Sequence, residues 1–245
     1  KFKKIRKKFY YTFSNKIIKE LDFSLTNNQT KIIDELNKDL KSEFKMFRLL
    51  QGDVGSGKTI VSLIAAANVI ESNFQVALMA PTEILAKQHF NFAIKIFKSS
   101  KINVEFLSGK TETKRKNKII NNLINGKINL LIGTHALFQK NILFKNLGLI
   151  IIDEQHKFGV KQRIELSKKG GKNCDILLMS ATPIPRSLIL AIYGDMDVSR
   201  LVEKPLNRKD IITLSKPEEK IDEIIFFIKK QIENKNQNIL GVSTN

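Results

Sequence analysis

The sequence from 47 to 59 reads Phe47-Arg48-Leu49-Leu50-Gln51-Gly52-Asp53-Val54-Gly55-Ser56-Gly57-Lys58-Thr59. Its apolar start predicts a β-strand, and the apolar residues 60–70 that follow the glycine-rich turn predict a helix. The turn fits G-x-x-x-x-G-K-[ST], the pattern of a phosphate-binding loop, in the strand–turn–helix context that this motif requires. An ordinary glycine-rich loop is the alternative, and the context makes it the weaker one.

This turn predicts a nucleotide-binding site. Glycines let the backbone bend round a phosphate chain with several N–H groups pointing inward, and the helix that follows adds the positive end of its dipole. We expect Lys58 to reach the β and γ phosphates and the Thr59 hydroxyl to hold Mg²⁺. The expected ATP contacts in the loop are Gly52, Asp53, Val54, Gly55, Ser56, Gly57, Lys58 and Thr59.

The chain has 245 residues, enough for one large domain or for one domain and part of another. A hydrophobic fraction of 42% supports a substantial core, and no run approaches the ~18 apolar residues of a membrane span. The basic start, residues 1–8, lacks the apolar segment of a secretory signal. The single cysteine, Cys174, excludes an internal disulfide and fits a reducing compartment.

The net charge of +18 favours nucleic acid as a partner, because clustered Lys and Arg replace the counterions of phosphates. The alternative is a bias in composition towards Lys, Asn and Ile, in which case solvated lysines carry no such meaning. In residues 1–22, basic residues alternate with aromatic ones such as Phe9 and Tyr10, which could lie along a nucleic-acid backbone. We favour a basic connecting helix from an upstream domain, because the chain begins at Lys1 rather than at Met.

Upstream of the loop, Thr26 is a good N-cap for a helix over residues 27–40. Gln29, one turn into that helix, carries an amide that can match a donor and an acceptor on an adenine edge. A glutamine on a helix is most often simply solvated. Its place just before the phosphate-binding loop is what makes Gln29 a candidate.

Strand and helix patterns alternate after the loop. We expect strands at 75–79, 102–107, 128–132, 147–152 and 175–179, and helices at 83–98, 113–124 and 185–193. Strands that are apolar on both faces and alternate with helices predict an α/β fold, with a mainly parallel sheet sandwiched by helices. Ligands bind such sheets at the carboxyl ends of the strands, where the remaining unusual residues lie.

Two strand ends are candidates for contacts with a DNA backbone. Pro81 and Thr82 follow the strand at 75–79, and the start of a helix suits a phosphate, although simple capping by Thr82 explains the residues equally well. Thr134, in Gly133-Thr134-His135, offers a second set of backbone and hydroxyl donors. His135 itself is more simply a structural histidine.

The strand at 147–152 ends in Asp153-Glu154-Gln155-His156. Two carboxylates beside a phosphate-binding loop are what phosphoryl transfer needs. We expect Asp153 to hold Mg²⁺, and Glu154 to orient and deprotonate the attacking water. Solvated acids at a strand end are the alternative.

The strand at 175–179 ends in Ser180-Ala181-Thr182. Small hydroxyl residues there can bond to the segment 153–156 and relay the state of the nucleotide, and a Ser/Thr turn before a proline-led helix is the alternative. From about residue 204 the pattern restarts, with strands at 210–214 and 238–242 and an amphipathic helix at 217–234. We interpret this stretch as the incomplete start of a second domain.

Taken in order, these motifs resemble those of the superfamily 2 helicases. Gln29 in its Phe-x-Leu-Thr setting resembles the Q motif, and residues 52–59, 80–89, 133–135, 153–156 and 180–182 resemble motifs I, Ia, Ib, II and III. The phrases QGDVGSGKT, APTEILAKQH, GTHALFQ, IIDEQHKFGVKQR and SATPIPRSL are closest in wording to the RecG family of bacterial branched-DNA helicases. The resemblance is strongest from about residue 23 to residue 203.

The resemblance implies two RecA-like motor domains that move on duplex DNA with ATP and Mg²⁺ in the bacterial cytoplasm. They remodel stalled forks and Holliday junctions in recombination and repair, and single-strand-binding protein is a further candidate partner. The chain then comprises a basic connector (1–22), the first motor domain (23–204) and the start of the second (205–245). The implied residues are Leu25 and Gln29 for adenine, His156, Ser180 and Thr182 for coupling, and Pro81, Thr82 and Thr134 for DNA.

In that family a wedge domain would precede Lys1, and motifs IV to VI, with their arginine finger, would follow Asn245. Such an arginine contributes ~10³ to 10⁵ in rate, so we expect this chain to bind ATP weakly, to hydrolyse it poorly and not to unwind DNA alone. Two other functions compete with this one. They are a P-loop enzyme acting on a small molecule, such as a kinase, and a nucleic-acid binder without hydrolysis, against which the intact Lys58, Asp153 and Glu154 argue.

Overall fold

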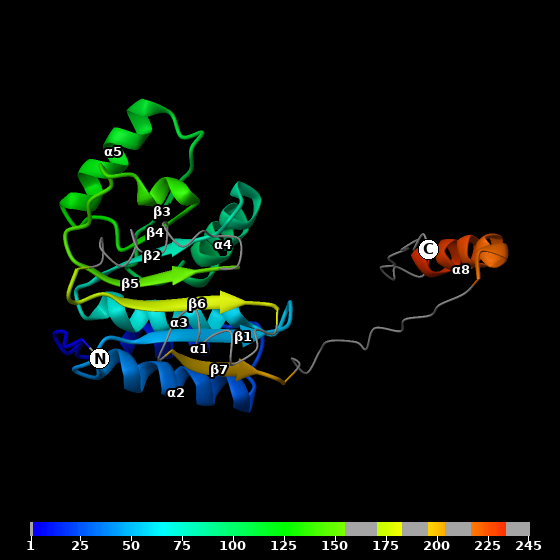
Figure 1. The fold of residues 1–245 in the computed structure, drawn as a ribbon, viewed down its shortest axis with the longest axis horizontal. Helices are drawn as coiled ribbons and strands as arrows, with labels where there is room; N and C mark the ends of the chain where they lie inside the picture. The colour runs from blue at the N-terminus through cyan, green and yellow to red at the C-terminus, as the bar shows by residue number, and fades with distance from the viewer. Residues whose placement is uncertain (1, 155–170, 183–195, 204–216, 234–245) are drawn as a thin grey trace. The chain divides into compact units, whose positions relative to one another are not determined.

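The computed structural model describes residues 2–154, 171–182, 196–203 and 217–233 (Figure 1). The chain divides into two compact units, Lys1–Leu206 and Asn207–Asn245. In the second unit, η3 (Glu218–Lys220) and α8 (Ile221–Glu233) lie within the helix predicted at 217–234. The helix predicted at 185–193 and the strands predicted at 210–214 and 238–242 lie outside the described residues.

The first unit alternates strands with helices, as the sequence predicts. Its strands are β1 (Phe47–Gly52), β2 (Gln75–Met79), β3 (Val104–Leu107), β4 (Leu130–Gly133), β5 (Leu147–Ile152), β6 (Asp175–Ser180) and β7 (Asp197–Leu201). Its helices are α1 (Thr12–Lys19), α2 (Asn27–Lys41), α3 (Lys58–Glu71), α4 (Glu83–Ile96) and α5 (Thr113–Ile124), with the 3-10 turn η1 (His135–Phe138). α1 lies within residues 1–22, the predicted connecting helix, whereas the sequence patterns do not predict β7.

Among the described residues, the strands form one seven-stranded sheet in the order β3-β4-β2-β5-β6-β1-β7. Every pairing between neighbours is parallel, and Figure 1 shows the arrowheads of β1, β5, β6 and β7 pointing the same way. The predicted parallel sheet is therefore confirmed. β6, which ends in the predicted motif III, therefore lies next to β1, the strand that leads into the phosphate-binding loop. β5, which ends in the predicted motif II, is one strand further away.

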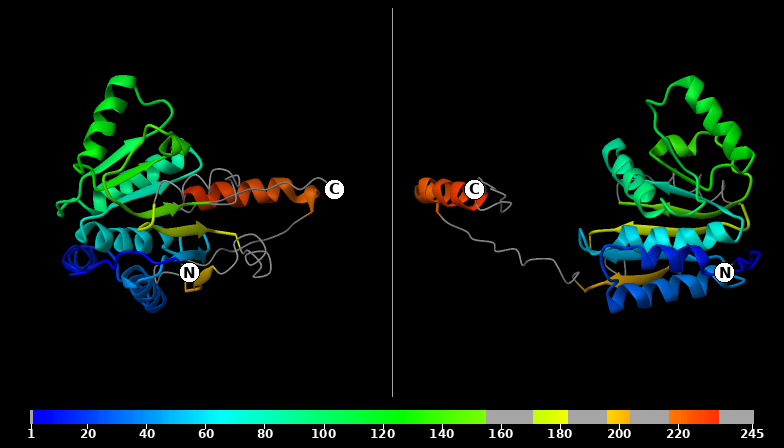
Figure 2. Two further views of the ribbon diagram at one scale, coloured as in Figure 1. Left: turned by 60° about the vertical axis from the view of Figure 1, so that its left-hand side comes forward. Right: turned by 180° about the vertical axis from the view of Figure 1, so that it is seen from behind.

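Helices cover both faces of this sheet. Alternate residues of one strand face opposite ways, so that Leu50 packs on the face covered by α2 and α3 and Leu49 packs on the face covered by α5. α3 is buried at every residue from Ile60 to Ile70, which explains why its sequence is apolar all round. The reverse view in Figure 2 shows α1, α2 and α3 side by side in front of the sheet.

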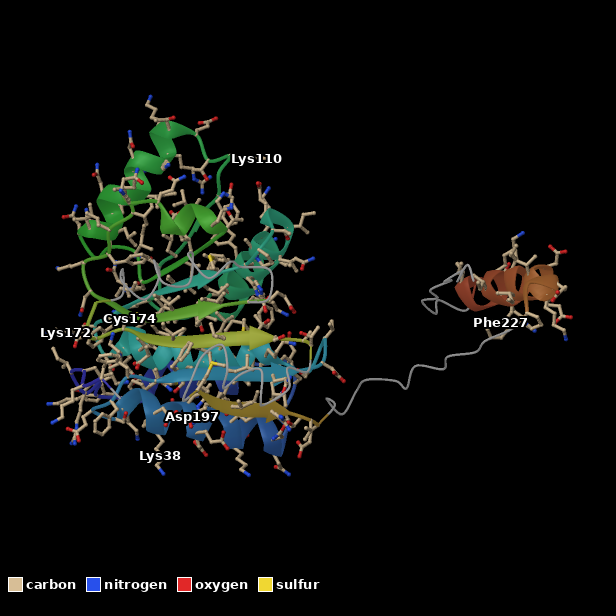
Figure 3. The ribbon with its side chains drawn as sticks, viewed as in Figure 1. Lys38, Lys110, Lys172, Cys174, Asp197 and Phe227 are labelled. Carbon is tan, nitrogen blue, oxygen red and sulfur yellow. The ribbon has the colours of Figure 1, made fainter. Side chains whose placement is uncertain are left out.

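The first residues of the chain are packed into the first unit. The ammonium groups of Lys4 and Lys7 each lie 2.6 Å from the Asp175 carboxylate, and none of these three side chains is exposed. The backbone N–H of Met46 donates to the same carboxylate at 2.7 Å. Cys174 lies beside this cluster at the tail of the β6 arrow in Figure 3. Within the stretch predicted as a connector, Lys4 and Lys7 thus bind the start of β6, and α1 packs against α3.

Within the described residues, no helix combines the length and apolar character that crossing a membrane would require.

Candidate active site

The phosphate-binding loop connects β1 to α3. Gly55 and Gly57 have φ angles of 78° and 93°, in the left-handed region that favours glycine. A Cβ at Gly57 would also collide with Nε2 of Gln29, and a Cβ at Gly52 would lie 2.7 Å from Oγ of Ser56. Backbone conformation therefore favours glycine at Gly55 and Gly57, and close packing favours it at Gly52 and Gly57.

Lys58 is the first residue of α3, and its ammonium group lies inside the loop. It donates hydrogen bonds to the carbonyls of Gly52 at 2.6 Å and Asp53 at 3.0 Å. Burial lowers the pKa of Lys58, while the carboxylates of Asp153, Glu154 and Asp53 act in the opposite direction. The fold therefore brings the motif I lysine under the electrostatic influence of the two acids predicted from the end of β5.

Gln29 links α2 to the loop from the other side. Its Oε1 accepts from the backbone N–H of Thr26 at 2.9 Å, and its Nε2 donates to the carbonyl of Ser56 at 2.9 Å. Oγ1 of Thr26 accepts in turn from the N–H of Gln29, which completes a capping box and confirms the predicted N-cap. A carboxamide has two donors and two acceptor positions, so Gln29 keeps one of each for the predicted contact with adenine. Leu25, half-buried, packs against the same core.

Asp153 directly follows β5 and is held on several sides. Its backbone N–H donates to the carbonyl of Met79 at 2.8 Å, and its side chain is almost wholly buried. Oδ1 accepts from the N–H of Glu154 at 3.0 Å, and Oδ2 lies 2.7 Å from Nε2 of His89. Glu154 has a φ of 49°, which is uncommon for a residue other than glycine, so the chain turns directly after Asp153.

The chemistry of this site suits Mg²⁺. The metal prefers oxygen ligands and is usually bound by one or two protein side chains together with water and phosphate oxygens. Asp153 keeps a lone pair on each carboxylate oxygen beyond the two contacts above, and the Thr59 hydroxyl lies at the second position of α3. Within the described ranges, no group of three or more His, Cys, Asp or Glu is arranged so that it could hold a metal ion.

The loop also contains a buried polar atom with unused hydrogen-bonding capacity. Oγ of Ser56 is inaccessible to solvent and has no hydrogen-bond partner within the described part of the chain. A buried hydroxyl without a partner is costly unless a ligand supplies one. This residue belongs to the stretch predicted to cradle phosphates, and its environment fits that prediction.

The predicted coupling residues lie at the end of β6, next to β1. The hydroxyl oxygens of Ser180 and Thr182 are 3.0 Å apart, and the N–H of Thr182 donates to Oγ of Ser180 at 3.2 Å. Nε2 of Gln51 donates to the carbonyl of Thr182 at 3.0 Å. Motif III is therefore bonded to the strand that carries the phosphate-binding loop. His156, the third predicted coupling residue, lies outside the described residues.

The predicted DNA contacts lie at the ends of β2 and β4. Thr82 is the N-cap of α4, where its hydroxyl accepts from the N–H of Leu85 at 3.3 Å, so the capping interpretation is confirmed. Thr82 is exposed, and Pro81 before it is half-buried. Thr134 is only 5% exposed and its N–H donates to the carbonyl of Leu107. Its neighbour His135, interpreted from sequence as structural, is exposed.

Two residues of the site lie within the helicase-like phrases, but no role is predicted for them from sequence. His89 is the last residue of APTEILAKQH, and its side chain contacts Asp153 from the buried face of α4. Gln51 is the first residue of QGDVGSGKT and lies in β1 directly before Gly52. A polar side chain at a buried position was the available signal for both residues.

Comparison with known proteins places these features in a family. The family model described as DEAD/DEAH box helicase matches residues 26–189. The ATP-dependent DNA helicase RecG of Thermotoga maritima is 48% identical over 228 residues, which cover 93% of this chain and 29% of that protein. RecG of Bacillus subtilis is 44% identical over 233 residues, covering 95% of this chain and 34% of that protein.

Solved structures agree with this placement. A structure of RecG bound to a three-way DNA junction matches with a TM-score of 0.83 and 44% identity, covering 95% of this chain and 31% of that one. The DEAD-box helicase Mss116 bound to single-stranded RNA matches with a TM-score of 0.68 at 23% identity, which shows the shared fold alone. This chain spans about a third of the length of the RecG proteins that it matches. By its family model, its fold and the arrangement of its motifs, the chain belongs to the DEAD/DEAH box helicases.

Proposed function

We propose that this chain is the ATP-binding part of a DNA-remodelling motor of the RecG type, acting on branched or forked duplex DNA in the bacterial cytoplasm. Residues 23–204 form its first motor domain, and residues 205–245 begin the second. The observation that carries the proposal is the meeting of motifs I, II and III at one edge of the parallel sheet, with Lys58 beside Asp153 and Glu154. Similarity to RecG, one of whose structures contains a three-way DNA junction, supports DNA as the partner.

On this proposal, each residue at the carboxyl ends of these strands has its own role in ATP hydrolysis. The loop from Gly52 to Gly57 presents backbone N–H groups to the phosphates, and Lys58 places a positive charge beside them. Asp153 and Thr59 hold Mg²⁺, which neutralises negative charge on the phosphate oxygens when it is bound. Glu154 orients a water molecule and accepts its proton.

The order of strands also separates two functions along the edge. β1, β6 and β5 carry the residues assigned to nucleotide and metal, while β2 and β4 lead into Thr82 and Thr134, the residues predicted to contact DNA. Because β2 lies directly between β4 and β5, a change at one group of residues has a short path to the other. Single-strand-binding protein stays a predicted partner.

The test is Mg-ATP turnover without DNA, with single-stranded DNA and with forked duplex DNA. It should be run on this chain and on a longer version. The longer version also carries the segments that the RecG proteins have on either side of the region matched by this chain. We expect slow turnover in this chain and fork-stimulated turnover in the longer version, because an arginine from elsewhere in such motors contributes ~10³ to 10⁵ in rate.

The same assay separates this function from its competitors. A P-loop kinase would transfer phosphate to a small molecule and would ignore DNA. A nucleic-acid binder without hydrolysis would bind the fork and turn over no ATP in either version. Turnover that no DNA changes in the longer version would overturn the proposed function.

A further inference from the structure

His89 joins α4 to the end of β5 through its side chain. Nε2 of His89 lies 2.7 Å from Oδ2 of Asp153, and each side chain is only 10% exposed. A contact of this length between buried groups is a hydrogen bond protected from water. It connects residues 64 positions apart in the sequence.

The contact completes the fixation of the Asp153 carboxylate. Oδ1 is already held by the N–H of Glu154 at 3.0 Å, and His89 holds Oδ2. A carboxylate with one bond on each oxygen has its plane defined, and the second lone pair of each oxygen then points in a set direction. Without His89, Asp153 would keep one anchor and could rotate about it.

α4 connects this contact to a residue that is predicted to contact DNA. The helix starts after Thr82, an exposed residue predicted to contact DNA, and His89 lies seven positions further on. At about 1.5 Å per residue this is ~10 Å, or two turns, so Thr82 and His89 lie on nearly the same side of the helix. β2, the strand that leads into α4, pairs directly with β5, and the N–H of Asp153 donates to the carbonyl of Met79 at the end of β2. A small shift of α4 therefore reaches the carboxylate through His89.

We propose that His89 is a positioning residue, through which DNA bound at the start of α4 sets the orientation of the Asp153 carboxylate towards Mg²⁺. This inference rests on the proposed function, and it assigns to the predicted motif Ia a connection to the metal ligand of motif II. Partners that orient a metal ligand typically change metal affinity or activity by about 10- to 100-fold when they are removed.

The test compares His89→Ala and His89→Gln with the unchanged protein. The amide N–H of a glutamine can donate to Oδ2 from a position close to that of Nε2, whereas alanine cannot. Asn91→Ala is the matched control, because Asn91 is exposed on the same helix. The first measurement is the Mg²⁺ concentration that gives half of the maximal Mg²⁺-dependent binding of a fluorescent ATP analogue to this chain. The second is the ratio of fork-stimulated to basal turnover in the longer version.

We expect His89→Ala to raise the required Mg²⁺ concentration about tenfold and to lower the stimulation ratio by a similar factor, with fork affinity in the absence of nucleotide unchanged. His89→Gln should restore most of both values, and Asn91→Ala should match the parent. Unchanged Mg²⁺ dependence and stimulation in His89→Ala would overturn the role of His89. So would equal losses in both His89 variants, accompanied by equal drops in melting temperature, because they would show a purely structural residue.

Two different outcomes would show that the positioning role of His89 is wrong or that the proposed function is wrong. If no DNA changes turnover in the unaltered longer protein, the proposed function is wrong, and with it the coupling to DNA. If DNA stimulates the unaltered protein and His89→Ala alike, the motor stands and the positioning role falls.

Discussion

The role of Glu154 can be tested separately from the roles of its neighbours. It follows Asp153 directly, and its left-handed backbone conformation turns the chain away from the strand. Glutamine has nearly the same shape but accepts no proton at neutral pH. The substitution therefore removes the proposed base and leaves the loop, Lys58 and the metal ligand in place.

We predict that Glu154→Gln leaves the affinity for Mg-ATP nearly unchanged and lowers turnover in the longer version by about 10²- to 10⁴-fold, the usual contribution of a general base. Parallel measurement of nucleotide affinity and single-turnover rate checks both parts. Turnover equal to that of the parent would show that another group activates the water.

Single residues of the site differ in how far sequence alone predicts them. Gly57 and Lys58 follow from the motif, because the local backbone and the chemistry of phosphate demand those residue types at that spacing. The environment of Gln29 is only half predictable: the N-cap of α2 is local, whereas the bond to Ser56 depends on how α2 packs against the loop. His89 is not predictable in this way, because its partner lies 64 residues further along the chain.

At the scale of elements, the start of the chain and β6 depend on one another. Asp175 begins β6 and accepts from both Lys4 and Lys7, inside a site without solvent. β6 ends at Ser180, the first of the coupling residues. The same strand thus anchors the N-terminal segment at its tail and carries the predicted motif III at its head.

We predict that Asp175→Asn destabilises the first unit by about 3–5 kcal/mol, because two buried ammonium groups would lose their counter-ion. Urea unfolding measures this change, and Cys174 gives an independent reading. Burial raises the pKa of Cys174 to about 12, so the native thiol should react very slowly at pH 8, whereas Asp175→Asn should expose it and speed its labelling.

Asp22→Asn is the control for that substitution. Asp22 pairs with Lys95 at 2.7 Å, but both side chains are largely exposed, and such surface pairs contribute little to stability. No measurable change in urea midpoint is expected for it. Equal midpoints for Asp175→Asn and the parent would show that the buried cluster does not hold the N-terminal segment in place.

Elements differ in predictability for similar physical reasons. Apolar strands and capped helices are encoded locally, and those expected in the described residues of the first unit are confirmed to within about two residues at each end. β7 is partly polar, and it is placed by pairing with β1 and by the hydrogen bond from Arg48 to Ser199 at 2.8 Å. The first residues of the chain lie in a basic stretch, in which Lys4 and Lys7 find a partner only once β6 is in place. Such long-range contacts leave no local pattern.

At the scale of the whole molecule, the parallel sheet explains why distant motifs act together. Residues from positions 29 to 182 meet at one edge because every pairing between neighbouring strands has the same direction. The family fold was therefore predictable from strand patterns and from one loop. The way in which α4, β5 and β6 connect the predicted DNA contacts to the nucleotide required the three-dimensional arrangement.

The most direct test of the nucleotide site is an equilibrium titration of Mg-ATP into this chain and into its Lys58→Ala variant. We predict saturable binding that depends on Mg²⁺ and becomes about 10- to 100-fold weaker in the variant, the value of a lost charge-assisted hydrogen bond. Circular dichroism should show that both proteins are folded. Equal affinity in the two proteins, or no binding by the folded parent chain, would contradict the assignment of this edge as a nucleotide site.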